Sequence, residues 1–193
     1  MTLFVFTEEP SIQPIFNSLI PKLNPEARFE IRTHQGKQDL RHAIRTTIPV
    51  IAKRPEVKIL VAIDQDQEDC TNLKKAIVDD LNNARIEAPY RVVIVCRQLE
   101  NWFLGDMEAI QSAFPRFNPE AHRRKSHFRS VDLIKNAPHL LKSIIPEFSK
   151  TTKLPKLATA EKISRHLTPT NNTSASFLHC VQAMALLLAS PSS

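Results

Sequence analysis

Glycine is nearly missing from this chain: only Gly36 and Gly105 occur among its 193 residues. The phosphate-binding loops of nucleotide hydrolases and of dinucleotide-binding enzymes need several glycines at fixed spacing, because their backbone approaches the phosphates closely. Neither kind of loop can form here. We therefore expect any nucleotide hydrolysis to be the work of a partner protein.

Cysteine is also scarce, and long apolar runs are absent. The three cysteines have no metal-ligand spacing and cannot all pair, which is typical of a protein in a reducing cytoplasm. The seven histidines also form no zinc motif. The chain begins without the basic and apolar segments of a secretory signal, and its longest apolar run, "FLHCVQAMALLLA", is interrupted by His179 and Gln182. We expect a cytoplasmic protein that makes no contact with membranes.

The positive charge is concentrated in one region. The chain has a formal net charge of +6, yet residues 116–165 carry twelve Lys/Arg against four acidic residues, which leaves the remainder with fourteen basic and sixteen acidic residues. Lysines and arginines that contact phosphates give sequence-independent affinity for nucleic acid. The alternatives are a solvated basic surface and a face that binds an acidic protein partner.

Short β-rich runs alternate with helical patterns in the first half of the chain. We expect strands at 2–7, 29–33, 58–64 and 91–96, and helices at 10–23, 37–53 and 69–83. This order predicts an α/β fold with a mostly parallel sheet and helices on both faces. Ligands of such sheets bind at the carboxyl ends of the strands.

The pattern changes after the fourth strand. A helix is expected over 96–114, with Leu99, Trp102 and Phe103 buried, and from residue 115 prolines interrupt the basic region and strands disappear. Two further helices, at 156–167 and 174–189, are expected to cover the sheet. We predict an α/β core at 1–114 and a basic, mainly helical region at 115–193 packed on the same domain.

Acidic residues follow two of the predicted strands. Glu8 and Glu9 come after the first strand, and Asp64 and Asp66 close the third in "ILVAIDQDQEDC". Two carboxylates at i and i+2 can turn toward one point, and a third from another strand end completes an oxygen site for Mg²⁺, which could polarise a phosphoryl oxygen. Alternatively, Asp64 caps the next helix while the other acids lie on a solvated loop.

Five segments together resemble a known protein family: "FVFTEEPS", "HQGKQDL", "ILVAIDQDQEDCTNLK", "VCRQLENWFLGD" and "LPKLATAEKISRHLTPTNNTSASF". They resemble a prokaryotic family of unknown function that is often found beside AAA-type ATPases and is regarded as related to TOPRIM domains. TOPRIM domains hold Mg²⁺ with a Glu after the first strand and an Asp-x-Asp pair after a later one, an order matched by Glu8, Asp64 and Asp66. Glu9 and Pro10 stand where TOPRIM domains usually have glycine, so the choice between Glu8 and Glu9 stays open.

Other residues are candidates for the same site or for its substrate. Glu100 is either a further metal ligand or a structural partner of Arg91 or Arg97. The nucleases of the overcoming-lysogenization-defect (OLD) group, which contain TOPRIM domains, use a lysine near the metal, and this resemblance implies a catalytic role for Lys153 or Lys156. A basic cluster surrounds Phe128 and is the candidate nucleic-acid face: Arg123, Arg124, Lys125 and Arg129. Asp106 and Ser174 are expected to cap a turn and a helix, respectively.

The resemblance implies a nuclease that cleaves phosphodiester bonds with Mg²⁺ or Mn²⁺ and acts with an AAA-type ATPase in defence against mobile DNA. The first alternative is a non-catalytic adaptor that keeps the fold and uses its basic face for a nucleic acid or protein partner. The second is a hydrolase of a small phosphorylated molecule.

Overall fold

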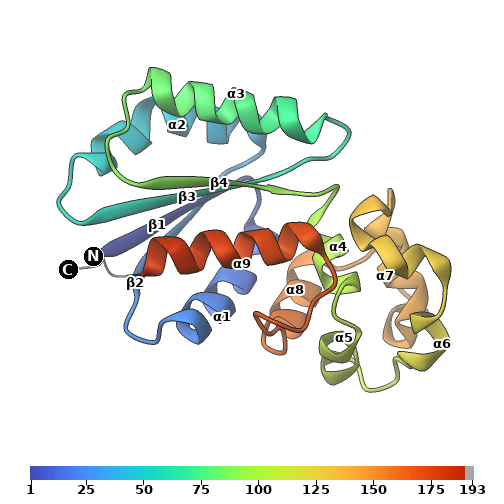
Figure 1. Ribbon diagram of the computed structural model, residues 1–193. Helices are drawn as coiled ribbons and strands as arrows, with labels where there is room; N and C mark the ends of the chain where they lie inside the picture. Colours follow the sequence, from blue (N-terminus) through green and yellow to red (C-terminus); the bar gives the residue numbers. More distant parts are fainter. Residues whose placement is uncertain (190–193) are drawn as a thin grey trace.

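A four-stranded, all-parallel sheet lies at the centre of the computed structural model, which describes residues 1–189 (Figure 1). Its strands are β1 (Thr2–Thr7), β2 (Arg28–Thr33), β3 (Val57–Asp64) and β4 (Tyr90–Val95), in the order β2-β1-β3-β4. Thr7 at the end of β1 is in register with Thr33 of β2 and Ala62 of β3. The carboxyl ends of the strands therefore meet at one edge, and the predicted α/β fold is confirmed.

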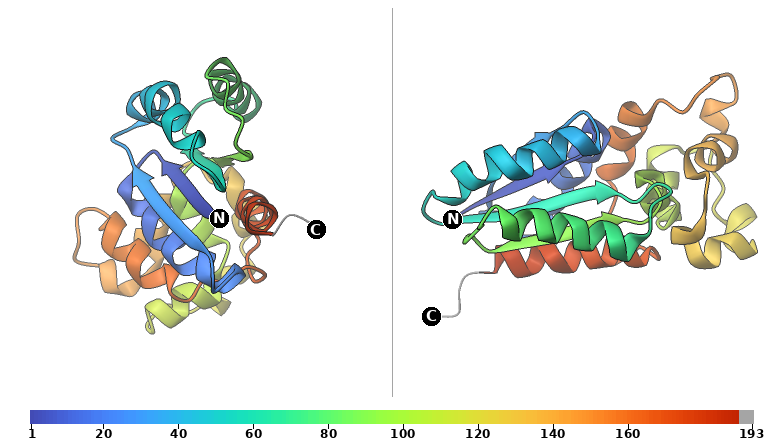
Figure 2. Two further views of the ribbon diagram at one scale, coloured as in Figure 1. Left: turned by 90° about the vertical axis from the view of Figure 1, so that its left-hand side faces the viewer. Right: turned by 90° about the horizontal axis from the view of Figure 1, so that it is seen from above.

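Helices cover both faces of the sheet. Helices α2 (Lys37–Ala52) and α3 (Cys70–Asn83) lie on one face, and α1 (Gln13–Leu23) and α9 (Ala175–Leu188) lie on the other (Figures 1 and 2). Successive side chains of β1 alternate between the layers, so that Phe4 and Phe6 pack with α2 and α3 while Leu3 and Val5 pack with α1 and α9. No helix within residues 1–189 is both long and apolar enough to cross a bilayer.

The remaining elements gather beside α1 and beyond the carboxyl ends of the strands (Figure 1). They are α4 (Leu99–Leu104), α5 (Met107–Ala113), α6 (Glu120–Arg123), α7 (Ala137–Ile144) and α8 (Lys156–Ser164), with 3₁₀ turns η1 (Pro10–Ile12), η2 (Ser126–Leu133) and η3 (Pro146–Phe148). Phe117, Phe128 and Leu141 join the same buried cluster as Leu3 and Val5. The basic region thus shares one core with the sheet as far as residue 189, and residues 190–193 of its predicted span lie outside the described residues.

Two helix predictions need correction. The single helix expected over 96–114 is broken into α4 and α5, because the backbone leaves the helical conformation at Asp106. Gly105, just before the break, has no room for a side chain because Asn172 lies against it. Asp106 then begins α5 by accepting a hydrogen bond from the Ala109 N–H at 2.9 Å, as expected of a cap. Of the two C-terminal helices, α9 packs on β3 and β4, whereas α8 packs mainly on α1, η1 and α5. Only α9 covers the sheet, because α1 lies between α8 and the strands.

Candidate functional site

The ends of β1 and β3 bring two of the predicted site residues into contact. Glu8 directly follows β1, Asp64 is the last residue of β3, and the Glu8 Oε2 atom accepts a hydrogen bond from the Asp64 backbone N–H at 3.2 Å. Asp64 is buried, with 8% of its surface exposed. The parallel topology thus places both carboxylates at the edge where ligands of such sheets bind.

Burial and mutual repulsion raise the pKa values of these acids. Burial is the main cause for Asp64, whose pKa lies well above its ordinary value, and the charges of Glu9, Glu8 and Glu100 raise it further. Burial likewise raises the pKa of Glu8 to about 7, although the nearby Lys37 ammonium lowers it. The pKa of Glu100 is raised by burial and lowered in part by Lys156. These acids therefore form one electrostatically coupled cluster.

One lysine predicted for the site lies against this cluster. Lys156 is the first residue of α8, and its Nζ atom is 3.6 Å from the Glu9 Oε1 atom and 3.7 Å from the Glu100 Oε1 atom. Burial lowers the pKa of this ammonium, but Glu100 and Glu9 outweigh that effect and keep it above its ordinary value. Lys156 is therefore charged and pairs with two acids from different elements.

Glu100 is deeply buried, on a helix where the sequence analysis named only Leu99, Trp102 and Phe103 as buried. It is 2% exposed, and its ion-pair partner is Lys156 rather than Arg91 or Arg97. The Oε2 atom of Glu100 is buried and has no hydrogen-bond partner among residues 1–189. A buried carboxylate oxygen without a donor is costly, so this atom is suited to accept a contact from a cation or a bound ligand.

Asp66 is turned toward a lysine that the sequence analysis did not select. The Asp66 Oδ2 atom lies 3.0 Å from the Lys37 Nζ atom, which also contacts Glu68 at 2.7 Å and the Gln65 carbonyl at 3.3 Å. Asp66 adopts a positive φ of 53°, which is uncommon for a residue other than glycine. Lys37 belongs to the segment "HQGKQDL", but that segment contained no physical signal that it would reach the loop after β3.

The carboxylates suit a divalent cation in their chemistry, although they are not assembled around one. Carboxylate oxygens are the ligands that Mg²⁺ and Mn²⁺ prefer, and the pKa values of Glu8 and Asp64 are raised mainly by burial and further by neighbouring acids. Within residues 1–189, no three His, Cys, Asp or Glu side chains are arranged as a metal-ligand set. The residues that would hold the ion are Glu8, Asp64 and Asp66, and in this structure the last of them pairs with Lys37.

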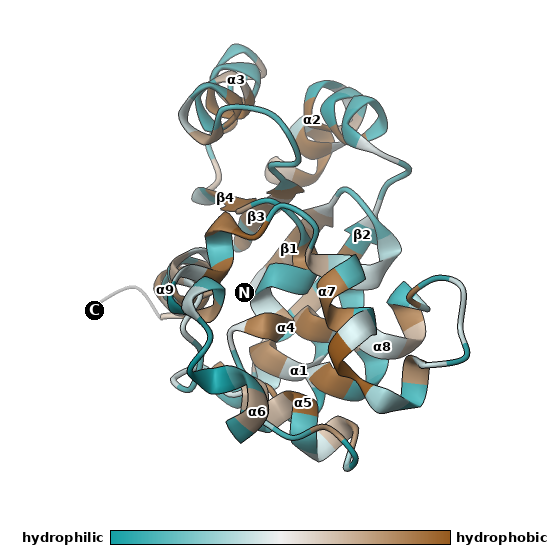
Figure 3. Cartoon of the chain, turned by 90° about the vertical axis from the view of Figure 1, so that its right-hand side faces the viewer, coloured by the Kyte–Doolittle hydropathy of each residue, from teal (hydrophilic) through white to brown (hydrophobic). Residues whose placement is uncertain are grey.

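The basic cluster at 123–129 lies away from the acids. Helix α6 is beside α5 and is remote from the strand ends in both Figure 1 and Figure 3. Arg123 forms ion pairs with Glu108 of α5 and with Glu120 of its own helix, and Phe128 is buried as an anchor. The three other basic residues are exposed: Arg124, Lys125 and Arg129.

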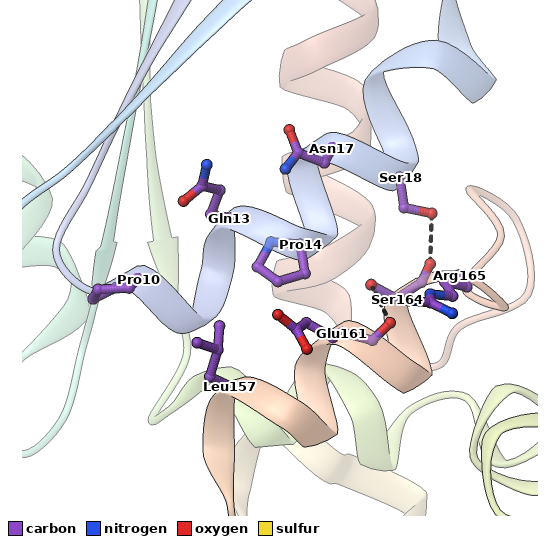
Figure 4. Close-up of a pocket in the computed structure, with 9 residues that line it drawn as sticks. All are labelled: Pro10, Gln13, Pro14, Asn17, Ser18, Leu157, Glu161, Ser164 and Arg165. Atoms are coloured by element: carbon purple, nitrogen blue, oxygen red, sulfur yellow. Dashed lines mark hydrogen bonds between the residues drawn. The ribbon is translucent and has the colours of Figure 1, made fainter.

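Lys153 lies in a different basic surface, which adjoins the acids. It lines a cavity of about 440 Å³ between the beginnings of α7 and α8, together with Lys142 and Lys156. A larger cavity, of about 690 Å³, lies between α1 and α8 (Figure 4). Its only charged lining residues are Glu161 and Arg165, and none of the predicted catalytic residues lines it.

The helix caps test the alternative explanation of the acidic loop. Asp69, not Asp64, caps α3 by accepting a hydrogen bond from the Asn72 N–H at 2.9 Å. Ser174 caps α9 as expected, by accepting a hydrogen bond from the Phe177 N–H at 3.1 Å. Asp64 is therefore not a helix cap, and its burial among other acids has no such structural reason.

Sequence reasoning missed a buried polar network beside α4. Asp132 accepts hydrogen bonds from the Ser174 hydroxyl at 2.6 Å and the Ser176 N–H at 2.9 Å. The Ser176 Oγ atom in turn accepts a hydrogen bond from the Trp102 Nε1–H at 2.8 Å. The network joins α4, η2 and the beginning of α9, and so fixes the helix that carries Glu100.

Comparison with known proteins identifies a family but no activity. Residues 7–185 match the model of a domain of unknown function, DUF4276, and the chain belongs to this family. No curated protein and no solved structure matched the chain. The family match agrees with the resemblance to a family of unknown function, and it does not bear on TOPRIM domains, OLD nucleases or ATPase neighbours.

Proposed function

We propose that this DUF4276 protein is a nuclease that hydrolyses phosphodiester bonds and depends on Mg²⁺ or Mn²⁺. The observation that carries the proposal is the convergence of Glu8, Asp64 and Glu100 at the carboxyl edge of the sheet, where Asp64 and Glu100 are buried, Glu8 is half-buried, and burial raises all three pKa values. Burying several acids together costs free energy, because burial and like charges both disfavour their ionised forms. Acids with shifted pKa values at the ligand-binding edge of a sheet are typical of functional sites.

In this proposal, Glu8, Asp64 and Asp66 hold the cation. The ion, when bound, supplies charge neutralisation and polarises the phosphoryl oxygen. Asp66, which pairs with Lys37 in this structure, would have to give up that contact to serve as a ligand. Lys156, charged and held by Glu9 and Glu100, stabilises the negative charge that develops on the phosphoryl oxygens.

A cleavage assay tests this function with a matched pair of variants. Purified protein is incubated with single- and double-stranded DNA and RNA in Mg²⁺, in Mn²⁺ and in a chelator. Asp64→Asn should abolish the cation-dependent cleavage, because it removes charge from the proposed site without removing volume from the core. Asp69→Asn, in the same loop, should cleave like the wild type, because asparagine also caps a helix and the exposed Asp69 side chain is remote from the buried acids.

The same assay decides against the nuclease if Asp64→Asn and wild type, both free of contaminating activity, cleave equally or not at all. A non-catalytic adaptor is then the better account. One observation favours that alternative: Lys37 pairs with Asp66 and Lys156 pairs with Glu9 and Glu100, so side chains of the protein neutralise part of the acidic cluster. An AAA-type ATPase partner and a role in defence against mobile DNA remain part of the proposal through the family resemblance alone.

A further inference from the structure

We propose that the cavity between α7 and α8 is a phosphate-binding subsite, which holds a phosphate of the nucleic acid next to the bond that is cleaved. The position next to a cleaved bond rests on the proposed nuclease function. The binding of phosphate in the cavity does not depend on it. The site differs from the basic cluster at 123–129 that the sequence suggested. Lys156 is the residue that it shares with the acidic cluster, and it requires no metal ion.

The lining of this cavity is basic and polar. Its volume of about 440 Å³ is ample for a phosphate group with part of a nucleotide, and the lining side chains that can donate hydrogen bonds are those of Asn136, His139, Lys142, Thr152, Lys153 and Lys156. No carboxylate is among the residues that line it. Of its three lysines only Lys156 faces carboxylates, so the lining carries an excess of positive charge that favours an anion.

Two of these lysines are not used by the fold. Neither Lys142 nor Lys153 forms an ion pair within the part of the chain that the structure describes. By contrast, Arg123 of the basic cluster is already bound to Glu108 and Glu120. The charges of Lys142 and Lys153 are therefore available to a ligand, because neither has to leave an ion-pair partner before an anion binds.

The backbone adds to this attraction. Helix α7 begins at Ala137 and α8 begins at Lys156, so both helices begin at the cavity. The N–H groups of a first helical turn have no partner within the helix and carry partial positive charge. The two helix ends therefore support the three ammonium groups and do not compete with them for the anion.

Lys156 connects the cavity to the acidic cluster. Its side chain lines the cavity and also lies within 3.7 Å of both Glu9 and Glu100. A phosphate held by Lys142 and Lys153 would thus lie next to the phosphodiester that is cleaved at the carboxylates. The two would be consecutive phosphates of one nucleic-acid strand. The ligand could be an internal phosphodiester or a terminal phosphate, which share the same chemistry.

Nuclear magnetic resonance titration tests the subsite directly. Inorganic phosphate, added to the full chain without divalent cations, should shift the backbone amide signals at the beginnings of α7 and α8. The double variant Lys142→Gln/Lys153→Gln should weaken this binding by about tenfold or more, since hydrogen bonds between charged groups account for at least that factor. The control, Lys53→Gln/Lys75→Gln, removes the same charge from two exposed lysines, one directly after α2 and one on α3, and should bind phosphate like the wild type.

Short oligonucleotides then distinguish the two sources of phosphate. Tighter binding of a 5′-phosphorylated oligonucleotide than of its 5′-hydroxyl form, lost in the double variant, assigns the subsite to a terminal phosphate. Equal binding of both forms, with the same loss in the variant, assigns it to an internal phosphodiester. Phosphate shifts located elsewhere, or unchanged affinity in the double variant, would overturn the proposal.

Failure of the subsite and failure of the nuclease can be told apart. If phosphate binds at α7 and α8 while the protein cleaves no nucleic acid, the proposed function fails and the subsite stands. If cation-dependent cleavage is lost in Asp64→Asn but phosphate binding does not respond to Lys142 and Lys153, the function stands and the subsite fails.

Discussion

The Lys156 ammonium lies 3.7 Å from the Glu100 carboxylate, of which only 2% is exposed. This pair joins α8 to α4 across the edge of the sheet. Removing Lys156 leaves Glu100 buried with no cation beside it, so Lys156→Met should lower the free energy of unfolding by about 1–2 kcal/mol, the value being limited because the lysine is partly exposed. Urea unfolding measures the loss. Lys150→Met, at an exposed site nearby, should change it little, and equal losses in the two variants would contradict the account.

The pH dependence of stability can be followed at Asp106, which lies apart from the proposed cation site. Burial raises its pKa from 3.8 to about 6. The Asp106 carboxyl therefore binds its proton more tightly in the folded protein than in the unfolded chain. As a result, the contribution of Asp106 to stability falls as the pH rises from about 3.8 to about 6. Asp106→Asn keeps the cap and removes the charge.

Urea unfolding of Asp106→Asn at two pH values measures that contribution. At pH 7.5 we expect a gain of about 1–2 kcal/mol over the wild type, and a smaller gain at pH 4.5, where the wild-type carboxyl is already protonated. A gain that is larger at pH 4.5 than at pH 7.5 would mean that the carboxylate is stabilised in the folded protein.

The hydrogen bond from Trp102 to Ser176 predicts a specific loss of stability. In Ser176→Ala the buried Trp102 N–H loses its partner, which should cost about 1–3 kcal/mol. Trp102 is the only tryptophan of the chain, so its fluorescence reports both unfolding and any change of its surroundings in the folded state. Ser143→Ala, on the exposed side of α7, is the matched control and should unfold like the wild type; similar stability of the two variants would argue against the network.

The basic cluster predicts a dependence of nucleic-acid binding on salt. Neutralising Arg124, Lys125 and Arg129 should weaken binding to unrelated sequences about equally and lower the salt slope by up to roughly 3 units, about one per lost phosphate contact. Arg123→Gln should lower it less, because Glu108 and Glu120 already neutralise that side chain. Fluorescence anisotropy at several salt concentrations provides both values. If the triple variant keeps its affinity and slope, an acidic protein partner explains this surface better.

The sequence was sufficient to predict the sheet and the meeting of two acids. Alternating β-rich and helical segments define parallel strands, and parallel strands end at one edge, so the proximity of Glu8 and Asp64 follows from topology alone. The contact that leaves no room for a side chain at Gly105 did not follow, because Asn172 belongs to a distant loop.

Side-chain partners were the least predictable part of the site. Lys156 was a candidate because of a family resemblance, yet its pairing with Glu100 depends on how α8 packs over α1, which no local pattern encodes. The same holds for the contact between Lys37 and Asp66. Charge density along the chain identified a basic region, but only the fold separates the paired Arg123 from the unpaired lysines beside α7 and α8.

The central claim is that the carboxylates at the ends of β1 and β3 hold a divalent cation. Anomalous diffraction from crystals soaked with Mn²⁺ tests this claim most directly, because it locates the ion without relying on turnover. The account predicts a peak among Glu8, Asp64 and Asp66, with Asp66 released from Lys37, and no such peak in Asp64→Asn crystals. Wild-type crystals with no peak at this edge of the sheet, or with a peak that persists in the variant, would contradict it.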